Sequence, residues 1–336
     1  MADDFIGMGM AVIVVTASIV LAGILIGVGR AFGYKKVEHF GINELIQSII
    51  NAAIIGSFAA IVTLVSTVAG DIAEKTCTTG DVISQLSCTL TSLNSDIFIL
   101  FQEVVKTLSI LGYYQALTLD FTAFSITPFT NLAATSNILS AHVLIIQLLM
   151  ILVQLNVQIL SFISNNALAL LFPVGLVLRT FFATRKVGGF LVALALGLVL
   201  FYPTFIMIFP NPKEDVKTAI GYAGNITNNT LYATIPVVDL NNNYALAGKI
   251  DMMSGRCDNP VNTSHCYNLT NGNSTYKADF SGELTLLTQS SGNSIAKMFL
   301  YSVLAPLFSL LVTIVFVKEL GNILGSEINL GSVMNI

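Results

Sequence analysis

Apolar runs long enough to cross a lipid bilayer recur along the chain, with short polar stretches between them. The clearest runs are residues 5–29, 42–69, 188–209 and 296–317. A transmembrane α-helix needs about 20 mostly apolar residues to span roughly 30 Å of hydrocarbon. The pattern therefore predicts an all-α polytopic membrane protein.

Composition supports a membrane protein over a soluble one. Only 10% of the 336 residues are charged, whereas about 25% are charged in a typical soluble domain. The first apolar run follows the acidic segment MADD, whereas a secretory signal peptide begins with basic residues. We therefore expect this run to be retained as a membrane helix.

The number of crossings depends on residues 89–178. Three crossings, at 97–117, 138–163 and 167–178, give seven transmembrane helices in total. A single crossing at 138–163, with its flanks lying in the interface or re-entering, gives five. Glu103 and Lys106 have the i,i+3 spacing of a self-neutralised pair, and Pro173 and Gly175 interrupt the segment 167–178. We favour about seven helices and keep five as the alternative.

Basic residues predict the orientation in the cell membrane. None precedes the first run, and two clusters follow apolar segments: Arg30, Lys35 and Lys36, and then Arg179, Arg185 and Lys186. Lys and Arg are enriched in cytoplasmic loops. Both clusters are therefore expected in the cytoplasm, which places the N-terminus outside and the C-terminus in the cytoplasm. Phosphates of lipid or nucleic acid would also meet these residues, but orientation alone accounts for them.

The orientation divides the chain into four parts. Residues 1–209 form a helical bundle with an outer loop at 70–95, and residues 210–295 form an extracellular domain. Residues 296–318 are the last crossing, and residues 319–336 are a cytoplasmic tail. Short alternating segments such as LYATIPVV, YALAGKIDM and TYKADFSGELTLLT predict that the extracellular domain is small and β-rich.

Candidate modification sites agree with this orientation. Five Asn-x-Ser/Thr triplets lie in the extracellular segment, at Asn225, Asn228, Asn262, Asn268 and Asn273. They predict an N-glycosylated domain, since glycosylation requires an external or lumenal location. All four cysteines are on the predicted outer side, and their spacing favours the disulfides Cys77–Cys88 and Cys257–Cys266 over the two other pairings.

Enzyme motifs are missing from the sequence. It contains no GxSxG, HExxH or Walker motif, and the three histidines (His39, His142 and His265) do not have metal-ligand spacing. We therefore expect a protein without enzymatic activity, cofactor or metal.

Polar and small residues inside the apolar runs are the candidate functional positions. The candidates for a polar path are Asn43, Glu44, Gln47 and Asn51 on one helix and Gln147, Gln154 and Gln158 on another. Polar groups in hydrocarbon tend to face a bundle interior or a wet cavity, and interhelical hydrogen bonding is the alternative explanation for the amides. The small-xxx-small segments GILIG (23–27) and ALALG (193–197) favour close packing, either within the chain or against other membrane subunits.

Residues 172–203, FPVGLVLRTFFATRKVGGFLVALALGLVLFYP, combine a Pro/Gly-broken helix, a basic turn and a small-residue helix. This segment resembles the CedA-type polytopic membrane subunit of archaeal DNA-import machinery, which is similar to the inner-membrane channel subunit of type IV secretion systems. The resemblance implies a membrane subunit that acts with a HerA-type hexameric ATPase and small membrane partners, with DNA as the transported substrate. The large sequon-bearing segment is not part of that family's pattern.

Three functions follow as hypotheses. The first is a non-enzymatic membrane subunit of a macromolecular translocation complex for DNA import or conjugation-like transfer. The second is a small-solute or ion transporter, and the third is a surface receptor or cell-envelope anchor that acts through its ectodomain. The partners expected in the first case are membrane lipids, other membrane subunits, a hexameric ATPase and DNA.

Overall fold

The chain is mostly helical and divides into two compact units. The computed structural model describes residues 4–72, 77, 81–120, 122–180, 184–233, 243–254, 268–271, 274–277 and 279–324. Unit 1 comprises residues 1–91, 154–210 and 301–336, and unit 2 comprises residues 92–153 and 211–300. The units alternate along the sequence, so neither coincides with a single predicted segment.

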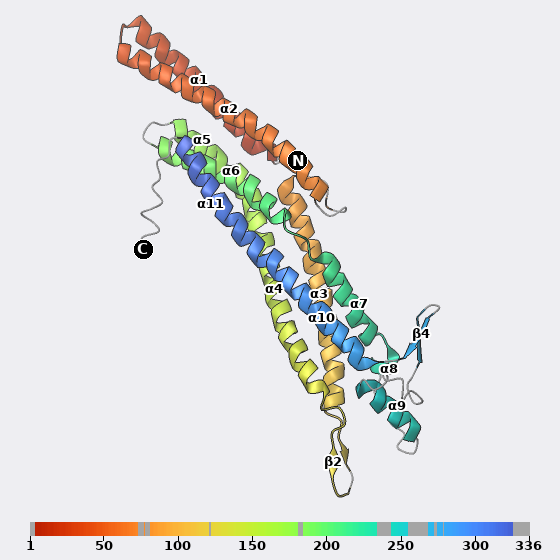
Figure 1. Cartoon of the computed structure of the whole chain (residues 1–336). Helices are drawn as coiled ribbons and strands as arrows, with labels where there is room; N and C mark the ends of the chain where they lie inside the picture. The colour runs from red at the N-terminus through yellow and green to blue at the C-terminus, as the bar shows by residue number, and fades with distance from the viewer. Residues whose placement is uncertain are drawn as a thin grey trace. The chain divides into compact units, whose positions relative to one another are not determined.

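Unit 1 is built on two groups of helices (Figure 1). α1 (Asp4–Ala31) and α2 (Lys35–Ile72) form an antiparallel pair. Gly33 lies in the turn between them with a φ of 69°, a left-handed conformation that glycine adopts without steric cost. α6 (Arg185–Met207) packs against both α5 (Phe172–Thr180) and α11 (Ala305–Ile323).

Unit 2 contains most of α3 (Val82–Gln115) and the first part of α4 (Leu132–Asn166). It also contains α7 (Lys213–Thr227), α8 (Thr230–Ala233), α9 (Asn243–Ser254) and α10 (Phe280–Phe299). Two hairpins complete it: β1 (Leu119–Asp120) with β2 (Ser125–Ile126), and β3 (Asn268–Asn271) with β4 (Ser274–Lys277).

A heptad repeat holds the long helices of unit 2 together. A series of buried residues on α3 follows alternating steps of four and three: Leu86 and Leu90 in unit 1, then Leu93, Ile97, Leu100, Val104, Thr107, Leu111 and Tyr114 in unit 2. α10 repeats the same steps in unit 2, at Phe280, Leu284, Leu287, Ser291, Ser294 and Met298, and its continuation adds Tyr301 and Ala305 in unit 1. This spacing keeps one seam of each helix facing its neighbours, as in coiled coils and antiparallel bundles. The sequence therefore carries a helical-bundle signal that the hydropathy runs did not reveal.

Two π-helical turns interrupt the long helices just before prolines. η1 (Ala167–Leu171) precedes Pro173 of α5, and η3 (Leu300–Leu304) precedes Pro306 of α11. Proline has no backbone N–H, and its ring clashes with the carbonyl four residues earlier in a regular helix. A wider π turn at that point relieves the crowding, and such turns are frequent at functional sites.

Five helices of the described chain are long and apolar enough to cross a membrane: Val12–Ala31, Val82–Gln115, Leu132–Asn166, Arg185–Met207 and Phe280–Ile323. The chain is thus consistent with a membrane protein, whereas the predicted count of seven crossings is not confirmed. These five helices also differ from those of the five-crossing alternative. Among the described residues they include α3, which that alternative did not count as a crossing, and they leave out α2, which it did count. Several are longer than a bilayer requires: the 44 residues of Phe280–Ile323 extend roughly 66 Å at 1.5 Å per residue.

Two predictions about individual segments are not confirmed. The predicted crossing at 167–178 falls on η1 and on α5, whose 9 residues measure about 14 Å and cannot span the hydrocarbon alone. The β-rich character of residues 210–295 is not confirmed, since their described part is mostly helical and contains one hairpin. YALAGKIDM lies in α9, where Met252 and Met253 are buried. Short alternating segments are ambiguous between strand and helix, and the helical bundle decided this one.

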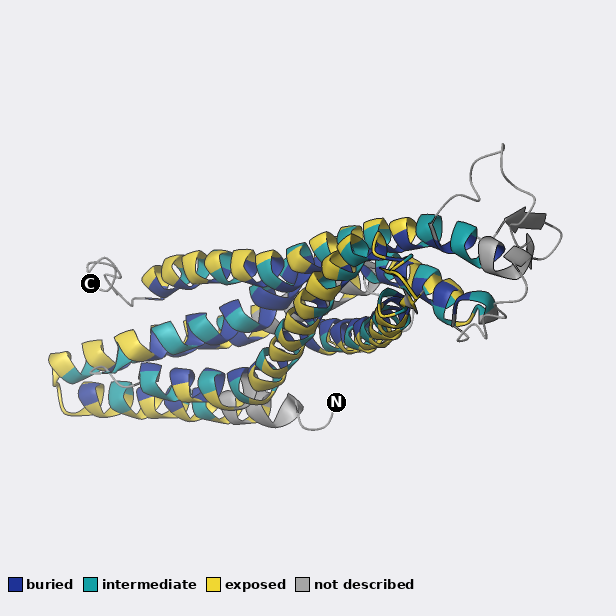
Figure 2. Cartoon of the chain, turned by 90° about the horizontal axis from the view of Figure 1, so that it is seen from below, coloured by how far each residue is buried: buried dark blue, intermediate teal, exposed yellow. Residues whose placement is uncertain are grey.

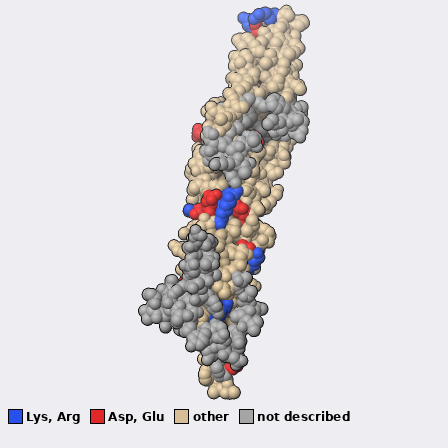
Figure 3. All heavy atoms as spheres, turned by 90° about the vertical axis from the view of Figure 1, so that its right-hand side faces the viewer, with Lys and Arg blue, Asp and Glu red and all other residues tan. Residues whose placement is uncertain are grey.

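Large apolar surfaces remain open on the helices. Figure 2 shows exposed and buried residues alternating along the long helices that it colours by burial. On α4 the exposed side chains include Leu144, Leu148, Ile151, Leu155 and Phe162. Among the described residues on the face drawn in Figure 3, charged side chains gather in small patches. Such an apolar exterior is the surface that lipid or other membrane subunits would cover.

Candidate functional site

A buried polar network lies among the broken helices of unit 1. The Asn156 amide donates from Nδ2 to the backbone carbonyl of Ser302 at 3.0 Å. The Tyr202 hydroxyl donates to Asn156 Oδ1 at 3.4 Å, and Ser309 Oγ donates to the Tyr202 carbonyl at 2.6 Å. All four residues are buried, so the network joins α4, α6, η3 and α11 through hydrogen bonds shielded from solvent.

The sequence explains why Ser302 needs this partner. Its carbonyl lies four residues before Pro306, which has no N–H to donate to it. The Asn156 side chain supplies that donor. The same logic applies in transporter helices, where neighbouring side chains satisfy backbone groups that a proline leaves free. The network is therefore a direct consequence of breaking the helix at Pro306.

A charged cluster lies where α5 ends and α6 begins. Arg185 Nη2 is 2.8 Å from Glu44 Oε2 of α2, and both side chains are mostly buried. Arg179 is only 4% exposed, and neither its Nε nor its Nη1 has a hydrogen-bond partner. Burial first, and then the positive charge of Arg185, lowers the pKa of Arg179. Among the residues that the structure describes, the cluster thus holds the guanidinium groups of Arg179 and Arg185 and the carboxylate of Glu44.

Two glycines bring α5 and α6 together at this cluster. A Cβ on Gly188 would lie 2.4 Å from the backbone nitrogen of Arg179 and 2.5 Å from the carbonyl oxygen of Gly175. A Cβ on Gly175 would in turn lie 2.9 Å from the backbone nitrogen of Val192. Thr184 Oγ1 donates to the Leu178 carbonyl at 2.7 Å. The close approach fixes Arg179 between the two helices.

The residues predicted to form a polar path differ in their burial in the structure. On α2, Glu44 pairs with Arg185, Asn51 is 2% exposed with an unpartnered Oδ1, and Asn43 is exposed. Gln47 is half-buried. These residues therefore do not form one continuous buried stripe.

On α4, the predicted stripe faces outward. Gln147, Gln154 and Gln158 are exposed, and the buried polar residue of this helix is Asn156. Sequence reasoning missed Asn156 because the glutamines form a regular stripe of their own. The heptad spacing of the buried residues, such as Val153 and Leu160, would have identified it.

Ion pairs in unit 2 join its helices. Glu103 lies 2.6 Å from Lys106 Nζ, which confirms the self-neutralised pair, and it also accepts a hydrogen bond from Thr227 of α7 at 2.5 Å. Lys297 of α10 pairs with Asp215 of α7 at 2.7 Å. The Glu103–Lys106 pair lies within α3, whereas the hydrogen bond from Thr227 to Glu103 and the pair of Lys297 with Asp215 join different helices.

His142 of α4 makes a polar contact between two helices of unit 2. Its Nδ1 lies 2.8 Å from Ser291 Oγ of α10. Among the described residues no group of three His, Cys, Asp or Glu side chains is placed to hold a metal ion.

Aromatic residues lie around a half-buried lysine, Lys249, where α8, α9 and α10 meet α3. Lys249 Nζ lies 5.4 Å from the centroid of the Tyr114 ring and donates to the Leu231 carbonyl. The Tyr114 hydroxyl donates to the Tyr232 carbonyl at 3.1 Å, and the Tyr232 hydroxyl donates to Glu283 Oε1 at 3.2 Å. Burial lowers the pKa of Lys249 to about 8, so this lysine is close to its titration point under mildly alkaline conditions.

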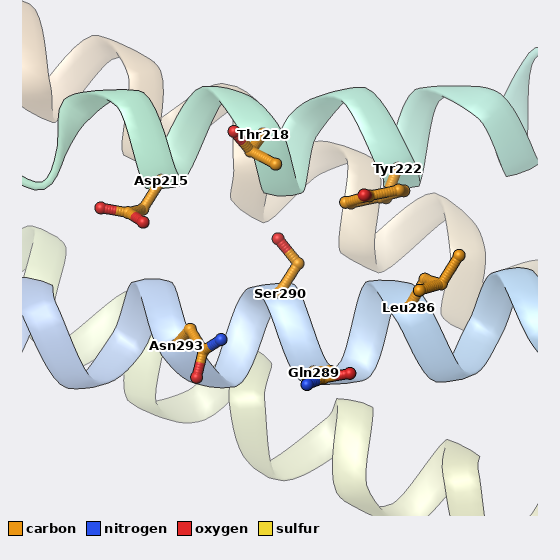
Figure 4. A pocket seen from close by; sticks show the side chains of 7 residues that line it. All are labelled: Asp215, Thr218, Tyr222, Leu286, Gln289, Ser290 and Asn293. Atoms are coloured by element: carbon orange, nitrogen blue, oxygen red, sulfur yellow. The ribbon is translucent and has the colours of Figure 1, made fainter.

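A shallow polar groove of about 240 Å³ lies between α7 and α10 (Figure 4). Its lining residues are Asp215, Thr218, Tyr222, Leu286, Gln289, Ser290 and Asn293. The groove's carboxylate, that of Asp215, is already paired with Lys297. The groove therefore has no unpaired charge with which to select a ligand.

The structure confirms one disulfide, Cys77–Cys88, with a Cα–Cα distance of 5.7 Å. Cys257, Cys266, Asn262 and Asn273 lie outside the described residues.

Two of the predicted glycosylation sites are exposed. Asn225 lies in the last turn of α7, and Asn228 follows that helix directly. Asn268 lies in β3. Use of these sites remains a prediction.

Comparisons of the chain with protein-family models, with curated proteins and with solved structures find no match.

Proposed function

We propose that the chain is a non-enzymatic membrane subunit of a larger translocation complex. The carrying observation is a pair of amides on the exposed face of α4, at Gln147 and Gln158. An amide that faces hydrocarbon without a partner is costly, so polar residues in membrane helices usually face protein or water. Neighbouring subunits would supply the missing hydrogen-bond partners.

The exposed face of α1 supports the same proposal. Gly23 and Gly27 of the GILIG segment have no atom within 4 Å of a Cβ built on them. In contrast, a Cβ on Gly197 of ALALG would meet Val317 Cγ2 at 2.5 Å. The second small-residue segment is therefore used inside the chain, whereas the first is open for a helix of another subunit.

The transported substrate in this proposal is DNA, as the resemblance of residues 172–203 implies. The sequence holds no Walker motif, so energy would come from a hexameric ATPase partner. The orientation proposed for the complex keeps the N-terminus outside and the C-terminus in the cytoplasm.

The proposal is tested by extracting the tagged chain from its own cells in mild detergent and measuring particle size. The wild-type chain should run in a particle much larger than its 35.9 kDa mass. The double variant Gln147→Leu/Gln158→Leu should weaken association about eightfold, if each amide contributes about 0.6 kcal/mol. Gln102→Leu, at an exposed position of α3, is the matched control. A monomeric wild-type chain, together with normal DNA transfer in a gene deletion, would contradict the proposal.

A small-solute or ion transporter is the second candidate, and the network around Asn156 favours it. Transporters often bind substrates where helices are broken near the membrane midplane, and this network lies between η3 and the Pro-containing helices α6 and α11. Uptake by purified protein in liposomes, lost in Asn156→Leu, would support this candidate. A lack of uptake across inorganic ions, sugars and amino acids would count against it.

A further inference from the structure

Arg179 is a buried cation without a described counter-charge. It is 4% exposed, and its Nε and Nη1 donate to no acceptor. No described carboxylate lies within ion-pair distance of it, since the nearby Glu44 pairs with Arg185. A guanidinium stays protonated in proteins, and an uncompensated buried charge is strongly destabilising. This position therefore requires an anion.

The cluster around Arg179 has the charge and donors to bind such an anion. The carboxylate of Glu44 pairs with Arg185, so the buried Arg179 beside it has no described counter-charge and two guanidinium nitrogens without an acceptor. Arg185 is 23% exposed at its side chain, so a ligand can approach from that side. The backbone contacts between Gly188 and Arg179 hold α5 in place, so the site is already formed before a ligand arrives.

We propose that Arg179, with Arg185 beside it, binds a phosphate group, that of an anionic membrane lipid or a free phosphate. Arginine is the preferred partner of phosphate because its planar guanidinium forms charge-assisted hydrogen bonds. Basic pockets between membrane helices on the cytoplasmic side bind lipid headgroups, and the basic residues of this turn predict that side. A DNA backbone is the less suitable ligand, since a duplex cannot enter the narrow space between α5 and α6 that surrounds Arg179.

The test uses the full-length protein in detergent and measures thermal unfolding together with lipid retention by native mass spectrometry. The probes are phosphatidylglycerol, phosphatidylcholine, sodium phosphate and a short DNA duplex. Wild-type protein should retain phosphatidylglycerol and unfold at a higher temperature in its presence. Arg179→Met should lower that affinity about tenfold or more, since a hydrogen bond to a charged group is the interaction removed.

Control variants separate the site from general charge effects. Arg30→Met removes an arginine that is 75% exposed at its side chain and paired with Glu38, and it should leave the lipid effect unchanged. Glu44→Gln releases Arg185 from its carboxylate and should strengthen phosphatidylglycerol binding. Glu44→Gln also provides a readout if Arg179→Met fails to fold.

The outcomes distinguish the ligand sources. Stabilisation by phosphatidylglycerol alone assigns the site to lipid, and equal stabilisation by sodium phosphate assigns it to a free phosphate. The proposal is overturned if Arg179→Met responds to both probes as the wild type does, if neither probe binds, or if only DNA binds. None of these results depends on whether the chain assembles with other subunits.

Discussion

Replacing Gly188 with alanine tests the close approach of α5 and α6. The added Cβ would lie 2.4 Å from the backbone nitrogen of Arg179, 2.5 Å from the carbonyl oxygen of Gly175 and 2.8 Å from the Cα of Arg179. Carbon contacts are favourable at about 3.5–4.0 Å. All three contacting atoms belong to backbone, so no side chain can rotate away. The helices must therefore separate by about 1 Å.

The expected magnitude follows from two opposing effects. Overpacking of this kind costs about 1–3 kcal/mol, and a gap of about 1 Å also forfeits up to half of the dispersion energy of the contacts it opens. Exchanging glycine for alanine inside a helix returns about 1 kcal/mol. We therefore expect Gly188→Ala to lower the free energy of unfolding by about 2 kcal/mol.

Two matched variants give a graded series. Gly27→Ala, where a Cβ meets nothing within 4 Å, should stabilise the protein by about 1 kcal/mol through helix propensity alone. Gly197→Ala meets Val317 Cγ2 at 2.5 Å, and this side chain can move, so the effect should fall between the other two. Gly188→Ala and Gly27→Ala should thus differ by about 3 kcal/mol.

The assay is reversible unfolding in mixed micelles, followed by far-ultraviolet circular dichroism because the sequence contains no tryptophan. All variants should keep the helical content of the wild type at low denaturant. If Gly188→Ala were as stable as Gly27→Ala, the two helices could not be in backbone contact at Gly188. The geometry assigned to the Arg179 site would then be wrong as well.

Three further predictions concern other parts of the chain. Replacing Cys77 and Cys88 with alanine should cost roughly 3 kcal/mol of unfolding free energy in the chain-entropy model, for a sequence separation of 11 residues. A reducing agent should destabilise the wild type by about that much more than the variant, which keeps the predicted disulfide Cys257–Cys266. The folded-state pKa of Lys249 is about 8 against its usual 10.5, so the unfolded chain binds more protons than the folded chain between these two pH values. The unfolding free energy of the wild type, measured relative to Lys249→Met, should therefore be constant below pH 7 and rise from about pH 8 to 10.5. Asn156→Leu should lower the free energy of unfolding by about 1–3 kcal/mol, because it leaves the Ser302 carbonyl without its donor. Adding Pro306→Ala to the same chain should recover part of this loss by supplying a backbone N–H. The absence of any recovery would contradict the assigned hydrogen bond.

The sequence contains a helical repeat along α3 that the runs of high hydropathy alone did not reveal. The buried positions of α3, from Leu86 to Tyr114, follow a heptad that can be read directly in the sequence. We instead predicted strands in residues 210–295 from short alternating segments. Short alternation fits both a strand and one side of a helix, whereas a heptad sustained over several turns fits only a helix.

The inward face of a uniformly apolar helix is harder to predict. On α4 both the stripe of glutamines and Asn156 interrupt apolar sequence, and only Asn156 is buried. Periodicity identifies the packed face when one side of a helix is polar. When both sides are apolar, it carries little information, so the choice between these amides depends on which helices pack against α4.

The sequence by itself determined that the chain forms apolar helices long enough to cross a membrane and where prolines break them, because these depend on local composition and on the missing N–H of proline. Cysteine spacing likewise favoured the pairing Cys77–Cys88, which the structure confirms. The partner of Glu44 and the burial of Arg179 were decided only by the tertiary structure. Both depend on contacts between α2, α5 and α6, whose residues are far apart in the chain, and no local pattern specifies which helices meet.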